Sequence, residues 1–292
     1  MNKTAIVPPG IGDIIWVIQK LINTGEQFEF LIPDGSPQRG KQVLDLLPQL
    51  AASARYAPDL SYRWIARNNT IRGQHWKHVC KHQRLVISAN EHLEAGQRLE
   101  SFLPDLPTSF HLDYQTSRED KEFGKQFARE GDVRHVGIYM SSLSNSAHYG
   151  GWTTTDWFYL IRFLWWRGTN LGLSVRFVLV GASYDQDAID QLSAILIQYS
   201  ISHVALIDSS FGRVVESLRQ FDYFISFPSG LGVLNETLGK AGTMFYGAHL
   251  HGLMKTWASL DRLESRQFNE TQFCRPEELY TWLKTTYRIF ER

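Results

Sequence analysis

Residues 221–247 read FDYFISFPSGLGVLNETLGKAGTMFYG, and this stretch decides the fold class. An apolar strand over 223–226 ends in the turn Phe227-Pro228-Ser229-Gly230, which opens a helix over 231–239. A second apolar strand follows over 243–246. A strand, a helix and a strand in this order are typical of a parallel sheet, because parallel neighbours need a long connection.

The same alternation extends upstream from this stretch. It predicts a parallel sheet with helices on both faces. The expected strands are 136–140, 176–180, 203–207, 223–226 and 243–246, and the expected helices lie near 155–167, 185–198, 212–220 and 231–239.

The first third of the chain also begins with a strand, a helix and a strand. The chain is therefore predicted to be an α/β protein with two domains of similar size. The expected N-terminal elements are strands over 4–7, 28–32 and 84–88, a Pro/Gly turn over 8–12, and helices over 13–22 and after Pro37.

A polar, charged stretch over 117–132 is predicted to be a solvated helix that leads to the interdomain linker. We place the domain boundary at Gly131-Asp132. The predicted domains are an acceptor-side domain over 1–132 and a donor domain over 133–274. A C-terminal helix over 275–292 is expected to pack on either domain.

The overall composition excludes several classes of protein. Lys and Arg number 30, as do Asp and Glu, so the formal charge of the 292-residue chain is zero and its overall field does not attract polyanions. No apolar run approaches the about 20 residues that span a bilayer, and the N-terminal apolar run is too short for a secretory signal. Two cysteines, Cys80 and Cys274, indicate a reducing, cytoplasmic setting.

The first glycine loop, Gly10-Ile11-Gly12-Asp13, lies between a predicted strand and a predicted helix. Backbone N–H groups and the helix dipole meet there, so the loop is a candidate site by position. Ile15 stands where the dinucleotide fingerprint has a third glycine, which disfavours NAD or FAD even though Asp34 follows the second strand. Taken alone, Asp13 is best explained as an acid that stabilises a helix start.

The second candidate site follows the strand over 223–226. Ser229 and the amides of Gly230 and Leu231 are expected to form an anion site at a helix N-terminus, suited to a diphosphate. The alternative is that Ser229 only caps the helix. Glu236, about two turns later, either binds ribose hydroxyls or faces solvent, and the sequence favours neither.

The glycine loop ending at Asp13 and the turn at Ser229 resemble the corresponding loops of the heptosyltransferases of glycosyltransferase family nine. Residues 137–142, Trp152 and 177–181 resemble further segments of that family. The resemblance spans most of the chain and implies the GT-B architecture, two Rossmann-like domains facing a cleft. It also implies an acceptor on the first domain and a nucleotide-sugar donor on the second. By this resemblance Asp13 corresponds to the catalytic base, and Ser141, Ser142, Ser229 and Gly230 correspond to donor-phosphate contacts. The positions of the residues add Leu231 at the phosphates, Glu236 at the ribose and Asp208, on the loop after a strand, at the nucleoside. Gly10 and Gly12 are expected on the acceptor side.

The chain departs from the family pattern at its donor motif. Where the family has Asp-Thr-Gly followed by a His, this chain has Pro228-Ser229-Gly230 and Val233. A lysine expected before Trp152 is also absent, with His148 and Tyr149 nearby. These departures favour a nucleotide sugar other than ADP-heptose, and the alternative is a protein that binds nucleotide or nucleic acid without turnover.

The expected reaction is a direct displacement that inverts the anomeric carbon. Asp13 would take the proton of the acceptor hydroxyl while the helix end at Ser229 stabilises the departing diphosphate. Asp185-Gln186-Asp187 matches an Asp-X-Asp metal motif, but acids at a predicted helix start have a simpler explanation. We therefore predict no metal and no cofactor besides the nucleotide sugar.

A basic, aromatic segment over 55–84 suggests the acceptor. Arg63, Arg67 and Arg72 are expected to bind a phosphorylated acceptor, either a lipopolysaccharide core or DNA. The alternative is a solvated loop with a few core aromatic residues. The expected location is cytoplasmic, with a peripheral position at the inner membrane if the acceptor is lipid-linked.

Overall fold

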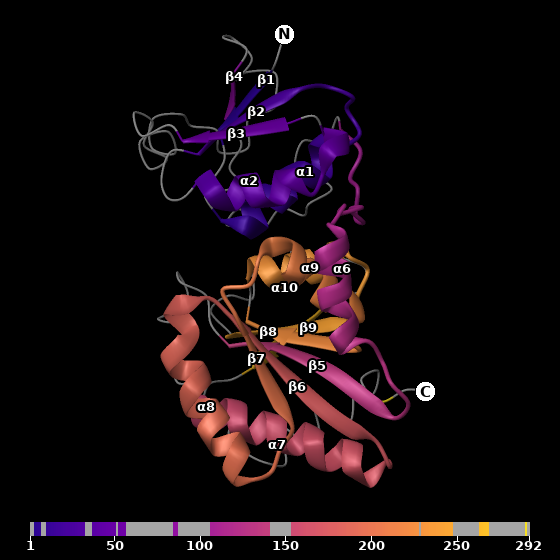
Figure 1. Ribbon diagram of the computed structural model, residues 1–292. Coiled ribbons are helices and arrows are strands. Elements are labelled where there is room, and N and C mark those ends of the chain that lie inside the picture. The colour runs from indigo at the N-terminus through magenta and orange to yellow at the C-terminus, as the bar shows by residue number, and fades with distance from the viewer. Residues whose placement is uncertain are drawn as a thin grey trace. The chain divides into compact units, whose positions relative to one another are not determined.

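We analysed a computed structural model of the protein. It describes residues 3–6, 10–32, 37–50, 52–56, 84–86, 106–140, 153–227, 229–247, 263–268 and 290. The chain forms two compact units, Met1–Gln115 with Gly252–Asp261 and Thr116–His251 with Arg262–Arg292. Each unit contains its own parallel sheet (Figure 1).

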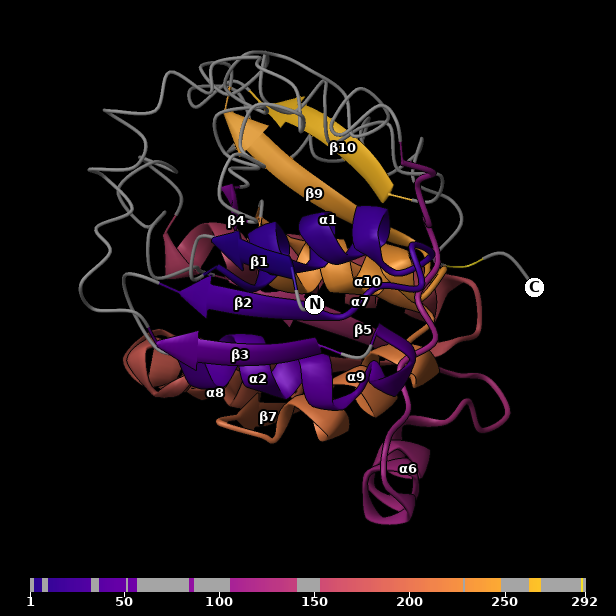
Figure 2. The ribbon, with the colours of Figure 1, turned by 90° about the horizontal axis from the view of Figure 1, so that it is seen from above.

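The sheet of the first unit has the strand order β3-β2-β1-β4, with every pair parallel (Figure 2). The predicted strand-helix-strand start is confirmed, whereas β3 was not predicted. Helix α1 is buried along its whole length from Ile14 to Leu21, including the polar side chains of Gln19 and Lys20. The elements are β1 (Lys3–Ile6), α1 (Ile11–Leu21), β2 (Phe28–Ile32), α2 (Pro37–Asp45), η1 (Pro48–Leu50), β3 (Ala52–Tyr56) and β4 (Arg84–Val86).

The sheet of the second unit has the order β10-β9-β8-β5-β6-β7, again all parallel. Counted from β5, this is the 3-2-1-4-5-6 order of nucleotide-binding doubly wound folds. The predicted strands are confirmed, and β10 is an edge strand that was not predicted. The strands are β5 (Val133–Tyr139), β6 (Ser174–Gly181), β7 (His203–Ile207), β8 (Tyr223–Ser226), β9 (Gly242–Gly247) and β10 (Leu263–Phe268).

Helices cover both faces of this second sheet (Figure 1). Alternate residues of β5, such as Val136 and Ile138, join a core with the apolar sides of α7 and α8. Gly137, between them, faces the other way, towards Phe221 and Phe224. The predicted helices are confirmed as α7 (Thr154–Asn170), α8 (Gln186–Gln198), α9 (Phe211–Gln220) and α10 (Gly230–Thr237). No helix in the described ranges is long and apolar enough to cross a bilayer.

The predicted domain boundary at Gly131 and Asp132 needs correction, because the second unit begins at Thr116. The helix predicted within 117–132 exists as α6 (Arg118–Gly124), continued by η4 (Lys125–Phe127). It is not a free linker: the Phe127 ring packs edge-on against Phe221, with 5.6 Å between centroids. At the C-terminus, Phe290 packs against the core of the second unit, while 275–289 lie outside the described residues.

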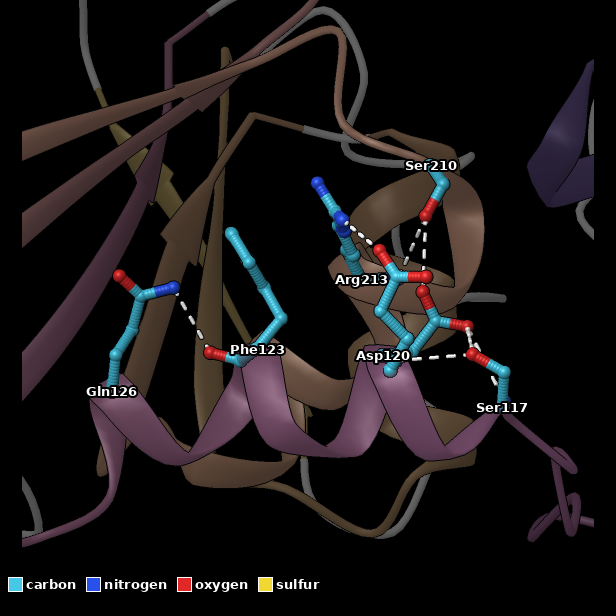
Figure 3. Close-up of polar contacts among 7 residues, drawn as sticks. Ser117, Asp120, Phe123, Gln126, Ser210 and Arg213 are labelled. Atoms are coloured by element: carbon cyan, nitrogen blue, oxygen red, sulfur yellow. Dashed lines mark hydrogen bonds and ion pairs between the residues drawn. The ribbon is translucent and has the colours of Figure 1, made fainter.

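Polar contacts fix α6 to α9 (Figure 3). Asp120 accepts hydrogen bonds from the hydroxyls of Ser117, at 2.6 Å, and Ser210, at 3.2 Å, so one carboxylate lies at the N-termini of both helices. Arg213 forms an ion pair with Glu119 at 2.5 Å. Thr116 donates to the buried carboxylate of Glu216, which anchors the start of the second unit.

The amino end of β5 carries a buried histidine. The backbone N–H of His135 donates to Asp222 Oδ2 at 2.8 Å. Burial is the main cause that lowers the pKa of His135 below its usual 6.5, and Arg176 adds to it, while Asp222 acts in the opposite direction. His135 is therefore more easily protonated in the unfolded chain than in the native protein.

Candidate functional site

The order of strands in the second sheet points to one place on its edge. The order reverses between β5 and β8, which are neighbours in the sheet although β6 and β7 lie between them in the chain. In open α/β sheets, ligands bind outside the carboxyl ends of the strands where the order reverses. Here these ends are Tyr139 and Ser226, which pair directly across the two strands.

Helix α10 begins at this edge with Ser229 as its N-cap. The Ser229 hydroxyl accepts a hydrogen bond from the N–H of Gly232 at 3.2 Å, so the capping interpretation is confirmed. A helix leaves its first N–H groups without partners inside the helix, and here these belong to Gly230 and Leu231, among others. The hydroxyl of a capping serine still carries a proton that it can donate. The geometry is thus compatible with both the cap and the predicted anion site.

Gly232 allows the first turn of α10 to approach the sheet. A Cβ at this position would collide with the end of Met244 and would lie 3.1 Å from Ser226 Oγ. Met244 and Ser226 are both fully buried beneath the turn. The sequence analysis missed this role, and its signal was a second glycine three residues after the capping serine.

The far part of α10 is buried. Glu236 has no exposed surface, so the alternative that it faces solvent is wrong. Its burial does not support direct contact with a ribose. Asn235 Nδ2 donates to the carbonyls of Lys240, at 3.0 Å, and Ala241, at 3.3 Å, which closes the end of the helix against the start of β9.

The loops after β6 and β7 meet at the same edge. Asp208 follows β7 with a positive φ of 48°, a conformation that Asp tolerates better than most residues. Its N–H donates to Gly181 O at 3.1 Å and its carboxylate accepts the N–H of Ser183 at 2.8 Å. The exposed Asp208 therefore lies where the sequence suggested, with its carboxylate engaged in joining the two loops.

Two tyrosines that the sequence analysis did not consider lie at this edge. The hydroxyl of Tyr184, in η5 (Ser183–Asp185), lies 3.2 Å from the hydroxyl of Tyr139 at the end of β5. Tyr139 is buried, whereas Tyr184 is 45% exposed. The signal available in the sequence was an aromatic residue directly after the strand end Gly181-Ala182-Ser183.

The Asp185-Gln186-Asp187 sequence lies at the start of a helix, as expected. Asp185 is buried and its Oδ2 accepts the N–H of Ala182 at 2.9 Å, while Asp187 is exposed in the first turn of α8. Across the described ranges, no three His, Cys, Asp or Glu side chains form a group that could hold a metal ion.

In the first unit, the strand order reverses between β1 and β4. Helix α1 begins after β1 with Gly10 as its N-cap, and the N–H of Ile14 donates to Gly10 O at 3.1 Å. Asp13 therefore belongs to the first turn of α1, as predicted, and so does Gly12, which was predicted in the turn before the helix. The side chain of Asp13 lies outside the described residues, as do Ser141, Ser142, Pro228, Arg63, Arg67 and Arg72.

Comparison with known proteins agrees with this architecture. No protein-family model and no curated protein sequence matches the chain. The E. coli ADP-heptose lps heptosyltransferase II structure matches it with a TM-score of 0.61 and 15% identity, over 98% of each chain. The chain has the GT-B fold.

Two further solved structures support this assignment. A family 9 glycosyl transferase from Veillonella parvula gives a TM-score of 0.59 with 10% identity, over 99% of this chain and 90% of that one. The E. coli heptosyltransferase WaaC with ADP-2-deoxy-2-fluoro heptose gives 0.54 with 14% identity, over 98% of this chain and 100% of that one. The resemblance to family nine is thus confirmed for the fold.

Proposed function

We propose that the protein is a glycosyltransferase that moves a sugar from a nucleotide-sugar donor to a hydroxyl group of an acceptor. The observation that carries this proposal is the N-terminus of α10 at the point where the strand order of the second sheet reverses, in a fold shared with heptosyltransferases. One of those similar structures contains an ADP-sugar analogue.

The donor diphosphate binds at the first turn of α10. The amides of Gly230 and Leu231 and the helix dipole supply positive potential there, which stabilises an anion by about 0.3–1 kcal/mol even at an exposed helix end. Ser141 and Ser142 complete the site from β5. They follow Tyr139 by two and three residues, and Tyr139 pairs with Ser226 directly before the α10 turn.

The nucleoside lies beside η5. The partly exposed ring of Tyr184, whose hydroxyl contacts Tyr139, offers a flat surface on which a base can stack. Asp208 joins the loops on either side and so shapes this part of the edge. Because Pro228 and Val233 replace the family's Asp and His, we assign the donor to a nucleotide sugar other than ADP-heptose.

The reaction is a direct displacement with inversion. The acceptor oxygen forms a bond to the anomeric carbon as the bond from that carbon to the donor diphosphate breaks, and Asp13 receives the hydroxyl proton. The amides at the start of α10 stabilise the negative charge that develops on the leaving diphosphate. The proposal includes no metal, because Asp185 and Asp187 lie at the start of α8, where acids stabilise a helix. The acceptor is phosphorylated, bound beside Gly10 and Gly12 and by Arg63, Arg67 and Arg72.

The test begins with a thermal-shift panel of ADP-, UDP-, GDP- and CMP-sugars, because a ligand at a hundred times its Kd stabilises the native protein by about 2.7 kcal/mol. Donor hydrolysis or transfer is then measured with a chelator present. We expect turnover that persists with chelator and is lost in Asp13→Asn.

The matched control is Asp45→Asn, which changes an exposed aspartate of the same unit that pairs with Lys41. We expect it to retain full turnover. Donor binding without any turnover would show that the protein binds nucleotide without being an enzyme. Turnover that Asp13→Asn retains would show that Asp13 is not the catalytic base.

A further inference from the structure

The carboxylate of Asp208 is fixed by one contact and keeps an oxygen for a ligand. Its Oδ1 accepts the N–H of Ser183 at 2.8 Å, and the backbone N–H of Asp208 donates to Gly181 O at 3.1 Å. Asp208 is exposed, and no donor among the described residues reaches its Oδ2. An ionised carboxylate only accepts hydrogen bonds and has room for about four, so Oδ1 can take a second donor as well. Asp208 therefore presents two adjacent acceptors to a ligand.

An aromatic residue accompanies this carboxylate. Tyr184 directly follows Ser183, the residue whose N–H the carboxylate accepts. The hydroxyl of Tyr184 lies 3.2 Å from that of the buried Tyr139, which holds the ring in place, and 45% of Tyr184 remains exposed. An exposed ring offers a stacking surface to a nucleobase, and polar groups beside it read the edge of that base by hydrogen bonds.

The position of Asp208 along the sheet edge favours contact with the base over contact with the ribose. The strands run in the order β8-β5-β6-β7, with the proposed diphosphate site after β8 and Asp208 after β7. Three strand spacings, roughly 14 Å, separate the ends of these two strands. In a nucleoside diphosphate the ribose adjoins the phosphates and the base lies beyond the ribose. The base therefore falls at the distant strand ends, those of β6 and β7, where Tyr184 and Asp208 lie.

Two adjacent acceptors match the Watson–Crick edge of guanine. Guanine presents two neighbouring donors there, N1–H and the 2-amino group. Adenine and cytosine place a ring-nitrogen acceptor beside their amino group, and uracil flanks its N–H with two carbonyls, so each of them turns an acceptor towards a carboxylate. We propose that Tyr184 and Asp208 form a guanine subsite and that the donor is a GDP-sugar. This inference rests on the proposed function and deepens it.

The first test is isothermal titration of the full chain with nucleoside diphosphates. We expect GDP to bind about tenfold or more tightly than ADP, UDP or CDP, because hydrogen bonds to an ionised group are the strong ones. Inosine diphosphate differs from GDP only in lacking the 2-amino group. It should bind about tenfold more weakly than GDP, since one of the two hydrogen bonds to Asp208 is lost.

The second test is Asp208→Asn, which separates recognition of the base from the contact between loops. Asn keeps an oxygen that can accept the Ser183 N–H, and it tolerates the positive φ of 48°. Its amide offers one acceptor and one donor, which match xanthine, where a carbonyl replaces the 2-amino group of guanine. We expect the variant to bind GDP about tenfold or more weakly, and xanthosine diphosphate about tenfold more tightly, than the unmodified protein does.

Asp222→Asn is the matched control. The carboxylate of Asp222 also accepts a backbone N–H, that of His135, at 2.8 Å, but Asp222 directly precedes β8, at the amino ends of the strands. This variant should bind GDP like the unmodified protein. If circular dichroism shows that Asp208→Asn does not fold, the comparison of GDP with inosine diphosphate on the unmodified protein decides.

The outcomes distinguish this inference from the proposed function. ADP, UDP or CDP bound more tightly than GDP would overturn the guanine subsite and leave the proposed function intact. Equal weakening of all four diphosphates in Asp208→Asn, with no gain for xanthosine diphosphate, would assign Asp208 to the ribose and also overturn the subsite. Binding of none of the diphosphates would overturn the proposed function together with the subsite.

Discussion

Replacement of Ser229 separates two roles that the structure allows for this residue. As a helix cap, Ser229 accepts the N–H of Gly232 at 3.2 Å, and loss of such a cap costs about 1 kcal/mol of unfolding free energy. For a unit of this size, that corresponds to a fall in Tm of roughly 2–4 °C. As a donor contact, its hydroxyl donates to a charged phosphate, a hydrogen bond of about 1.5–3 kcal/mol, or roughly 10–100-fold in Kd.

Two further variants distinguish these roles. Ser210 caps α9 in the same way, accepting the N–H of Arg213 at 3.3 Å, and it also donates to Asp120. We expect Ser210→Ala to lower Tm at least as much as Ser229→Ala while leaving the donor Kd unchanged. Glycine is a good cap without a hydroxyl, so Ser229→Gly should keep Tm within about 1 °C and still weaken donor binding.

The measurements are thermal melting by circular dichroism and donor affinity by isothermal titration, on the same preparations. The decisive comparison is Ser229→Gly, in which stability and donor contact are separated. If the donor Kd is unchanged in both Ser229 variants, Ser229 is only a cap and its hydroxyl does not contact the donor.

Three other predictions follow from buried or edge positions. Gly137→Ala would bring a Cβ within 2.5 Å of the Phe221 ring and 2.8 Å of the Phe224 ring, so urea denaturation should show a loss of about 1–3 kcal/mol, and an unchanged midpoint would contradict this packing. Because His135 has a lowered native pKa, its contribution to stability is complete above pH 6.5 and is lost as the pH falls below it, by at most about 1.4 kcal/mol per pH unit. His135→Gln should flatten the dependence of the unfolding free energy on pH below 6.5. A dependence identical to that of the unmodified protein would show that other groups cause it. Tyr184→Ala should weaken donor binding about tenfold, with Tyr184→Phe close to the unmodified protein, and equal losses in both would indicate that the hydroxyl rather than the ring matters.

Local patterns determined much of the second unit. Apolar runs such as Phe177 to Val180 and Gly/Pro punctuation around Pro228 predict strands, helices and turns, because both depend on neighbours a few residues apart. The Ser229 cap and the use of Asp185 at a helix start were predictable for the same reason.

Only the tertiary structure decided features that join distant segments. Thr116 donates a hydrogen bond to Glu216 across 100 residues, and the second unit begins at this residue. Tyr184 meets Tyr139 across 45 residues, and α10 turns Glu236 inward, although the sequence left its orientation open. The physical reason is that helix and strand patterns are set by local backbone geometry, whereas strand order and burial depend on which segments pack together.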